Sequence, residues 1–345
     1  MTWPDLLVTG FSSIGAGGAS AGLPDPAVRT SPELITGWIT PGPRRAVLVP
    51  PFRPADVVPG LRTRRLDRLS VWALVGTALA VQDAGLDHSA VDGDRAAVVF
   101  GTAFGCLELT EQFLGGLRLN AAHADPILFP ETLSNQPGSH VARHFGFRGP
   151  NLTVSAGMAS SETALLEAAS LLRNGEADCA VVFAGDLLTR SLFAWYEAAG
   201  RLASLCGGDA APAGGGDGVG LVPGEGLVAC VLEIREFAEQ RRARAYGRLV
   251  GGWVGPRREA GPRVGAAAAL LRRVAPGMHP DEAELVEGPS GGQAEVAGGA
   301  FGGCGLLQLG FALARLLESD RPCVMVASAV DCDPLGVLLV GRDPS

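Results

Sequence analysis

The feature that most constrains the fold is a series of short apolar runs separated by stretches with helical spacing. Two such helical stretches lie at Arg65–Gly85 and Ser160–Gly175, and the runs around them are apolar on both faces. Alternation of this kind is typical of a mostly parallel sheet covered on both sides. We therefore predict an α/β fold. Its first strands are expected at Leu6–Thr9, Ala96–Phe100, Asn151–Ser155, Cys179–Phe183 and Leu227–Leu232.

The same pattern returns in a shorter form after about residue 233. We therefore predict two α/β halves, 1–235 and 236–345, which form one compact unit with an abbreviated C-terminal half. Strands of the second half are expected at Leu249–Val254 and Ala283–Glu287, with a hairpin-like pair at Pro322–Ala327 and Leu335–Val340. Its helices are expected at Gly265–Val274 and Cys304–Leu317.

Composition excludes several classes of protein. The 345 residues include 28 basic and 36 acidic side chains, for a net charge of −8, and none of the basic residues is lysine. A nucleic-acid binder would carry a basic footprint, and phosphate-loop or Schiff-base chemistry needs a lysine. The seven cysteines are scattered, with no CxxC spacing. Together with the absence of a signal peptide or a long apolar segment, this pattern predicts a cytoplasmic protein.

Three local motifs are weak indicators of function. Gly18–Gly22 matches the GxSxG elbow of serine hydrolases, but neither a strand directly before it nor a helix directly after it is predicted. His140 and His144 have the spacing of a metal pair on a helix, yet no third ligand lies at motif distance, so no metal is predicted. The arginine clusters at Arg62–Arg68 and Arg235–Arg248 are typical of solvated helix faces, and the alternative is a docking patch for an acidic partner.

A longer set of motifs carries a resemblance. Gly149–Ser161 reads GPNLTVSAGMASS and is followed by a predicted helix, while RRLDRL precedes the first helix and GEG leads into the strand at Leu227. In this order the motifs resemble the β-ketoacyl synthases, the condensing enzymes of fatty-acid and polyketide synthesis. The resemblance covers about residues 1–250. It implies a thiolase-like fold, with duplicated α/β halves in a layered αβαβα arrangement.

The departures from this family concern its catalytic groups. The family nucleophile is a cysteine at a strand-to-helix turn, where the helix N-terminus lowers the pKa of the thiol. The matching residue is Met158, whose thioether has no proton to lose and cannot form an acyl thioester. The two family histidines match Glu287 and Gly299, and the family lysine is absent. The resemblance therefore implies a degenerate site without catalysis.

Within the family, these losses resemble the chain-length factor of type II polyketide synthases. That resemblance implies a heterodimer with an active ketosynthase, contact with an acyl carrier protein through the complex, and no cofactor. The expected dimer interface is the strand formed by Asn151, Leu152, Thr153, Val154 and Ser155. The residues expected to line and gate the acyl tunnel are Leu107, Thr110, Phe113 and Leu133.

Two alternatives remain open at this point. A condensing enzyme or acyltransferase with a different nucleophile would need Ser155, Ser160 or Cys304, none of which has a histidine at motif distance. A carrier-protein-binding scaffold subunit without an acyl tunnel would need no nucleophile at all.

Overall fold

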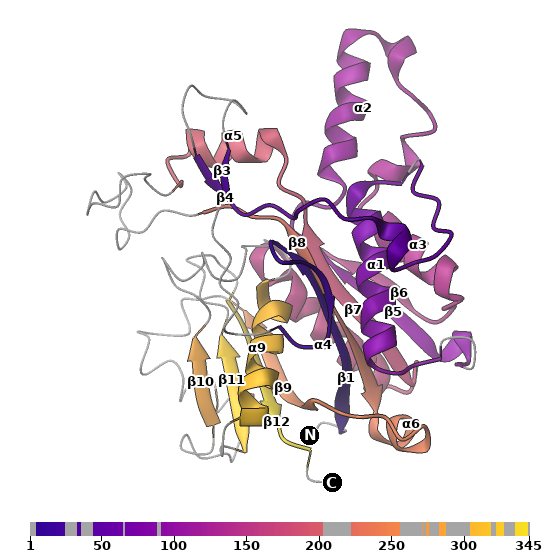
Figure 1. Cartoon of the computed structure of the whole chain (residues 1–345), viewed down its shortest axis with the longest axis vertical. Coiled ribbons are helices and arrows are strands. Elements are labelled where there is room, and N and C mark those ends of the chain that lie inside the picture. The colour runs from indigo at the N-terminus through magenta and orange to yellow at the C-terminus, as the bar shows by residue number, and fades with distance from the viewer. Residues whose placement is uncertain are drawn as a thin grey trace.

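A computed structural model describes residues 5–24, 33–35, 44–64, 66–87, 91–202, 222–255, 271, 274–275, 283–287, 304–318, 322–327 and 335–343. Most of the strands within these ranges join one sheet that runs through the molecule (Figure 1). The strands are β1 (Leu6–Gly15), β2 (Gly18–Ala21), β3 (Glu33–Ile35), β4 (Arg44–Ala46), β5 (Ala96–Gly101), β6 (Asn151–Val154), β7 (Cys179–Asp186), β8 (Gly226–Ile234), β9 (Gly247–Gly255), β10 (Ala283–Glu287), β11 (Cys323–Ala327) and β12 (Leu335–Gly341).

Helices lie on both faces of this sheet. The α-helices are α1 (Arg68–Asp83), α2 (Leu107–Leu119), α3 (Gln136–Phe145), α4 (Ser160–Arg173), α5 (Arg190–Ala198), α6 (Arg235–Gln240) and α9 (Cys304–Glu318). Short 3₁₀ turns are η1 (Pro54–Asp56), η2 (Gly93–Arg95), η3 (Ala121–His123), η4 (Pro130–Thr132) and η5 (Gly157–Ala159). None of the described helices is long and apolar enough to cross a membrane.

The strand order repeats between the two parts of the chain. The first part has the order β6-β5-β7-β8-β1, and the second has β10-β11-β12-β9. In each part a parallel pair is followed by two antiparallel pairs, and β1 and β9 join the parts in antiparallel register. The second part has no counterpart of β6 among the described residues. The predicted α/β fold with two similar halves, the second abbreviated, is therefore confirmed.

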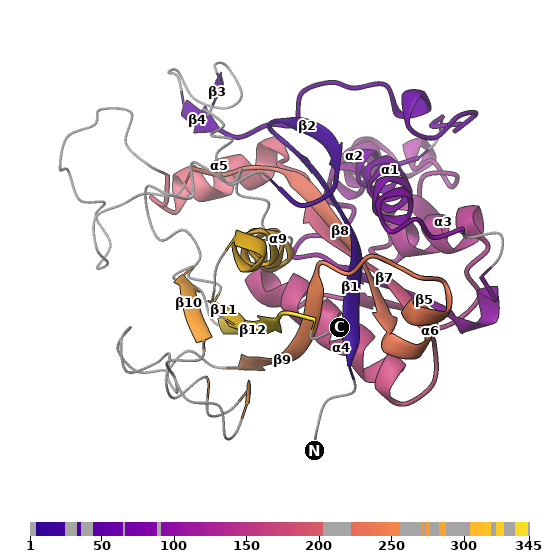
Figure 2. The same cartoon turned by 60° about the horizontal axis from the view of Figure 1, so that its bottom comes forward.

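Alternate side chains of the strands supply two cores. Helices α1 and α3 cover one face of the first part, against residues such as Val98 and Val181. Helices α4 and α9 pack on the opposite face, and the same core reaches β9 and β12 through Leu249 and Leu338 (Figure 2). Beyond those strands, Leu271 packs on their outer face. The two parts of the sheet therefore alternate with helices. α1 and α3 lie outside the first part, α4 and α9 lie between the two parts, and Leu271 lies outside the second part, as the αβαβα expectation requires.

The direction of the strands differs from the prediction. Only β5–β6, β5–β7 and β10–β11 are parallel among the described pairs, so the sheet is mixed rather than mostly parallel. A strand buried on both faces is apolar whichever way it runs, so hydrophobicity predicts coverage of the strand but not its direction. Strand β1 also continues past Thr9, through a register shift beside Gly10, where the backbone of α1 comes so close that a Cβ atom would not fit.

Candidate functional site

The sequence resemblance assigns the position of the family nucleophile to the turn between β6 and α4. Gly157 has φ +58°, a left-handed conformation that glycine adopts without steric cost. The Ser160 hydroxyl accepts a hydrogen bond from the Ala156 amide at 3.0 Å and lies 2.9 Å from the Thr102 carbonyl and 2.6 Å from the Gly157 carbonyl. The turn is therefore fixed, and it places residue 158 at the start of a helix, as the sequence predicts.

Met158 is packed among apolar side chains at this turn. It is half-buried and contacts a cluster that also includes Phe104 and Leu107. A thioether is a flexible filler of irregular gaps and has no ionisable proton. The space around the nucleophile position is thus filled by hydrocarbon, and the cluster is completed by Ala46, Leu188, Leu192, Phe193 and Tyr196.

A buried carboxylate fixes the loop that leads from β5 to α2. Asp186, fully buried at the end of β7, accepts hydrogen bonds from the Thr102 hydroxyl at 2.5 Å and the Phe104 amide at 2.9 Å. The Gly105 amide in turn donates to the Thr102 hydroxyl at 2.8 Å. Since β5 and β7 are parallel neighbours, their carboxyl ends bring these groups together. The start of α2 is thereby held beside Met158.

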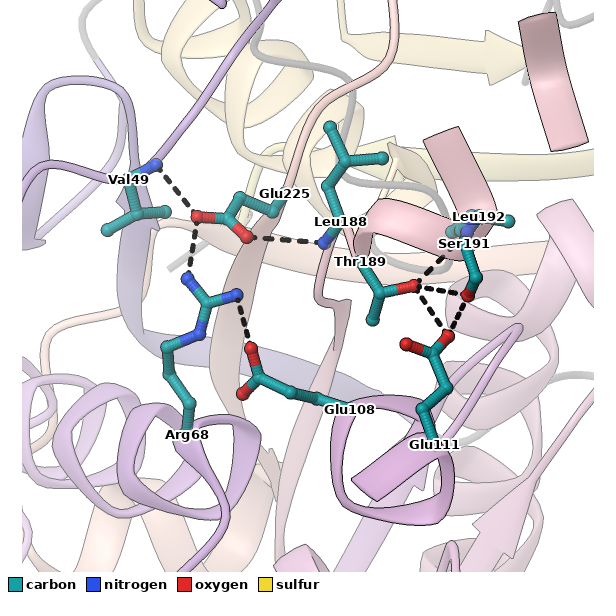
Figure 3. A network of polar contacts seen from close by, with 9 residues as sticks. All are labelled: Val49, Arg68, Glu108, Glu111, Leu188, Thr189, Ser191, Leu192 and Glu225. Carbon is teal, nitrogen blue, oxygen red and sulfur yellow. Dashed lines mark hydrogen bonds and ion pairs between the residues drawn. The ribbon is translucent and has the colours of Figure 1, made fainter. Parts of the chain in front are cut away.

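A second buried carboxylate, Glu225, connects three further elements (Figure 3). Its oxygens accept from the Val49 and Leu188 amides, each at 3.2 Å, and from the Arg68 guanidinium at 3.0 Å. Arg68 also reaches Glu108 on α2 at 3.3 Å. Burial raises the pKa of Glu225, and Arg68 together with the two amides opposes that rise. Removing Arg68 would therefore leave a buried charge with fewer partners.

Glu111 ties α2 to the start of α5 in the same region (Figure 3). Its carboxylate accepts hydrogen bonds from the hydroxyls of Thr189, at 2.8 Å, and Ser191. Thr189 also caps α5, because its hydroxyl accepts from the Leu192 amide at 3.2 Å. These contacts hold the first two turns of α2 on the body of the molecule.

The rest of α2 projects away from the body (Figure 1). None of its residues is buried, although all of them are described. We call residues 107–133 the α2 arm; they comprise α2, η3, η4 and the adjoining turns. The apolar side chains that the arm exposes are Leu114, Leu117, Leu119, Ile127, Phe129 and Leu133. An exposed apolar surface of this kind is a candidate for contact with another molecule.

The four predicted tunnel residues all lie on the α2 arm. Leu107, Thr110 and Phe113 are half-buried along one helix face, as their spacing predicts. That face lies against η4: the Thr110 hydroxyl is 3.4 Å from the Thr132 carbonyl, and the Phe113 and Phe129 rings are 5.6 Å apart. Leu133 is exposed directly after η4. The structure brings the four residues into one arm; their lining of a tunnel stays a prediction.

The predicted interface strand is β6, the last strand of the sheet. It pairs with β5 on one side, and no described strand pairs with its other edge. Asn151, Leu152 and Ser155 are exposed, whereas Thr153 and Val154 are half-buried. An unpaired edge offers amide and carbonyl groups for pairing with another chain.

The other predicted positions are placed as follows. Glu287 ends β10, where its backbone pairs in parallel register with Ala327. Gly299 and the side chain of Cys304 lie outside the described residues. The Ser20 of the GxSxG match lies in β2, which pairs antiparallel with β1, so no strand-to-helix elbow exists there.

The contacts of His140, one of the two histidines with the spacing of a metal pair, and of the second arginine cluster are as follows. His140 is buried between Glu131 and Arg143, and no group of three or more metal-binding side chains occurs among the described residues. Arg235 pairs with Asp5, Glu239 and Asp343, and Arg241 pairs with Glu233. These arginines are thus used in ion pairs within the chain.

Sequence reasoning missed the buried acid Asp67, which precedes α1. Its carboxyl oxygens have no hydrogen-bond partner of normal geometry among the described residues. Burial, with a smaller contribution from Glu108, raises the pKa of Asp67 to about 6, while the nearby Cys106 thiol opposes the rise. Burial likewise raises the pKa of Cys106. An apolar setting for both groups could not be read from the RRLDRL motif.

Comparison with known proteins identifies this arrangement. The family model described as beta-ketoacyl synthase, N-terminal domain, matches residues 48–238, more than half of the chain. The chain belongs to the β-ketoacyl synthase family. A Streptomyces halstedii protein named as a polyketide β-ketoacyl synthase is 35% identical over 199 residues, which is 54% of this chain and 47% of that protein. The 3-oxoacyl-[acyl-carrier-protein] synthase 2 of Staphylococcus aureus is 29% identical over 207 residues, 58% and 50% of the two chains. The chain thus spans about half the length of these curated relatives.

Solved ketosynthase structures share the whole fold. The ishigamide ketosynthase/chain length factor matches with a TM-score of 0.79 and 19% identity over 99% of both chains. The ketosynthase ApeO in complex with its chain length factor ApeC, from Xenorhabdus doucetiae, matches with a TM-score of 0.73 and 16% identity over 99% of this chain and 98% of that chain. The predicted thiolase-like fold of the ketosynthase family is therefore confirmed.

Proposed function

We propose that this member of the ketosynthase family is a non-catalytic subunit of the chain-length-factor type. In this proposal it pairs with a ketosynthase that carries the cysteine nucleophile, and it shapes the tunnel that limits the growing acyl chain. The observation that carries the proposal is Met158, which lies at the start of a helix, packs against an apolar cluster, and is matched by the motif to the family nucleophile. Without a thiol at this position the chain has no group there that could hold an acyl thioester.

Two surfaces support the pairing part of the proposal. The α2 arm exposes a run of apolar side chains, and β6 has an open edge. Both surfaces lower the solubility of a free chain, and a bound partner would cover them. Solved structures of the same fold are titled as a ketosynthase/chain length factor, as a ketosynthase with its chain length factor, and as a ketosynthase with an acyl carrier protein. We infer the same two kinds of partner here.

The second candidate is a scaffold subunit that binds the carrier protein without an acyl tunnel. It needs the same surfaces but no particular side chains at Thr110 or Phe113. An enzyme with Ser160 as its nucleophile is less well supported, because the Ser160 hydroxyl is buried and already engaged with three backbone groups. We also propose a cytoplasmic location, in keeping with the free thiols of the buried Cys106, Cys179, Cys230 and Cys323.

The test is co-expression of the tagged chain with cysteine-bearing ketosynthases encoded near it, followed by purification on the tag and light scattering. We expect a stable 1:1 complex, whose interface buries more than ~2,000 Å² as permanent interfaces do. With a carrier protein and extender substrate, the complex should make condensed products, whereas the chain alone should make none. A well-behaved monomer that ignores every such ketosynthase would refute the proposal. If the complex makes products whose lengths do not change when the tunnel residues are substituted, the scaffold alternative would be favoured.

A further inference from the structure

His140 on α3 holds two contacts that the site described above does not use. Its side chain is 5% exposed. Arg143 Nη2 lies 2.6 Å from His140 Nδ1, and His140 Nε2 lies 2.8 Å from Glu131 Oε2. A guanidinium can only donate hydrogen bonds, so Nδ1 must accept. The hydrogen of the ring is then on Nε2, where it donates to the Glu131 carboxylate.

These contacts connect the α2 arm to the body. Glu131 lies on η4 of the arm, whereas α3 packs on α1, β5 and β6. The other side-chain hydrogen bonds of this segment go to α2 and are weak: the Thr110 hydroxyl and the Cys106 thiol each lie 3.4 Å from a carbonyl. Two further contacts are the ring pair of Phe113 and Phe129 and a backbone bond of 3.0 Å from the Gln136 amide to the Leu133 carbonyl. The hydrogen bond from His140 to Glu131 is short, and its acceptor is a carboxylate. It is therefore the strongest described side-chain contact between η4 and the core.

Leu133 follows η4 directly, and its carbonyl is the one that the Cys106 thiol contacts. A shift of η4 therefore moves Leu133 and Phe129 together, relative to β6 and α3. Because these side chains are on the exposed part of the arm, their positions are otherwise set by few contacts. Among the described side-chain contacts of η4, the one from His140 is therefore expected to contribute most to its position.

We propose that His140 is a positioning residue: through Glu131 it fixes η4, and with it Leu133, and thereby sets the length of the product. The inference about product length rests on the proposed chain-length function; the inference about the anchor does not. Arg143 selects the ring tautomer, and Glu131 receives its hydrogen. No acyl group contacts His140 itself in this proposal.

Two substitutions distinguish the roles of the two ring nitrogens of His140. In His140→Gln, the side-chain amide nitrogen takes the place of Nε2 and can still donate to Glu131. In His140→Asn, the shorter amide reaches only the position of Nδ1, so Glu131 loses its donor. His144 is an exposed histidine one turn further along α3, and His144→Asn is the matched control.

Amide hydrogen exchange of the full-length chain tests the anchor without a partner. We expect the amides of residues 131–133 to exchange about tenfold faster or more in His140→Asn, and at nearly the original rate in His140→Gln and His144→Asn. The amides of α1 must stay protected, which shows that the fold is intact. If His140→Asn loses α1 protection, Glu131→Leu replaces it with the same expectation, because leucine has no acceptor for the Nε2 hydrogen. Unchanged exchange at residues 131–133 in an intact variant would overturn the anchor.

The mass distribution of carrier-bound products, made by the chain with its ketosynthase, tests the effect on length. His140→Asn should broaden or shift this distribution by at least one extension unit, and His140→Gln should restore it, with the complex equally assembled. A distribution that stays the same in an assembled His140→Asn complex would overturn the role in length. If the unsubstituted pair forms no complex or product, the proposed function fails, while the exchange result still decides whether His140 anchors the arm.

Discussion

At the scale of the residue, chemistry is decided at one position. Met158 occupies a turn that is well built for a nucleophile, with a left-handed glycine before it and a helix start after it. If the match of Met158 to the family nucleophile is right, this turn keeps the backbone of a reactive site without its thiol. The sequence predicts the residue at this turn because the surrounding motif fixes the register, whereas the absence of catalysis stays a prediction.

We predict that Met158→Cys does not restore condensation. The resemblance matches the family histidines to Glu287 and Gly299, neither of which can replace an imidazole. General acid–base groups contribute about 10²–10⁴-fold, so the variant should be at least about a hundredfold slower than a complete ketosynthase. Intact-mass measurement with an acyl thioester should show no adduct on the original chain and at most a slow adduct on the variant. Rapid condensation by the variant would mean that the histidine positions are wrongly matched.

Asp67 gives a prediction about pH. Its pKa rises from 3.8 to about 6 in the folded chain, so the folded state binds the proton more tightly than the unfolded state. Its contribution to stability is therefore complete below about pH 4 and is lost as the pH rises through 6. Asp67→Asn should leave stability unchanged near pH 4 and increase it at pH 8, by up to about 3 kcal/mol.

Denaturant unfolding at several pH values checks this expectation. Asp56→Asn is the control, because Asp56 is an exposed acid on η1. If the difference between Asp67→Asn and the original chain were the same at pH 4 and pH 8, Asp67 would not be the titrating group.

At the scale of the element, the sequence predicts the positions of most strands and helices but not the contacts that join them. Periodicity predicts most strands and helices to within a few residues, because burial on both faces dictates an apolar run. It does not predict α5, whose start is fixed by a hydroxyl cap and by Glu111, a residue on α2. Nor can spacing reveal the pairing of Arg68 with Glu225, which are brought together only by the fold.

The arm supports a prediction about product length. Thr110→Trp should fill the space between α2 and η4 and shorten the products of the complex, whereas Phe113→Ala should open it and lengthen them. Overpacking costs about 1–3 kcal/mol, and loss of a fully packed phenylalanine about 3–5 kcal/mol, so folding and assembly must be verified first. The half-buried Phe113 should cost less. Mass spectrometry of carrier-bound products gives the answer, and unmoved lengths in assembled variants would make these residues ordinary packing.

At the scale of the whole molecule, the strand order of the first part recurs in the second, and contacts between the two parts join them into one sheet. The halves meet through β1 and β9 and through α4 and α9, where Gly305 and Gly336 lie so close to the Glu162 carboxyl that a Cβ atom would not fit. These contacts are remote from the exposed arm. The sequence predicted the halves from their pattern, but the glycines that join them have no local signature.

Substitutions on the surface of the arm should therefore affect assembly with a partner without affecting folding stability. Leu114 and Leu117 on the arm are 48% and 41% exposed, and Leu317 on α9 is 60% exposed. Replacing an exposed leucine by glutamate changes folding stability by about 0.5 kcal/mol or less at each site. In an interface, however, the same change removes about 1.5–3 kcal/mol of apolar burial per residue and buries a charge without a partner. The double variant Leu114→Glu/Leu117→Glu should thus weaken binding to the ketosynthase at least about a hundredfold, and Leu317→Glu should not. Light scattering of the mixed proteins, with thermal unfolding of each variant, measures both quantities; equal assembly by all three chains would mean that the arm faces no partner.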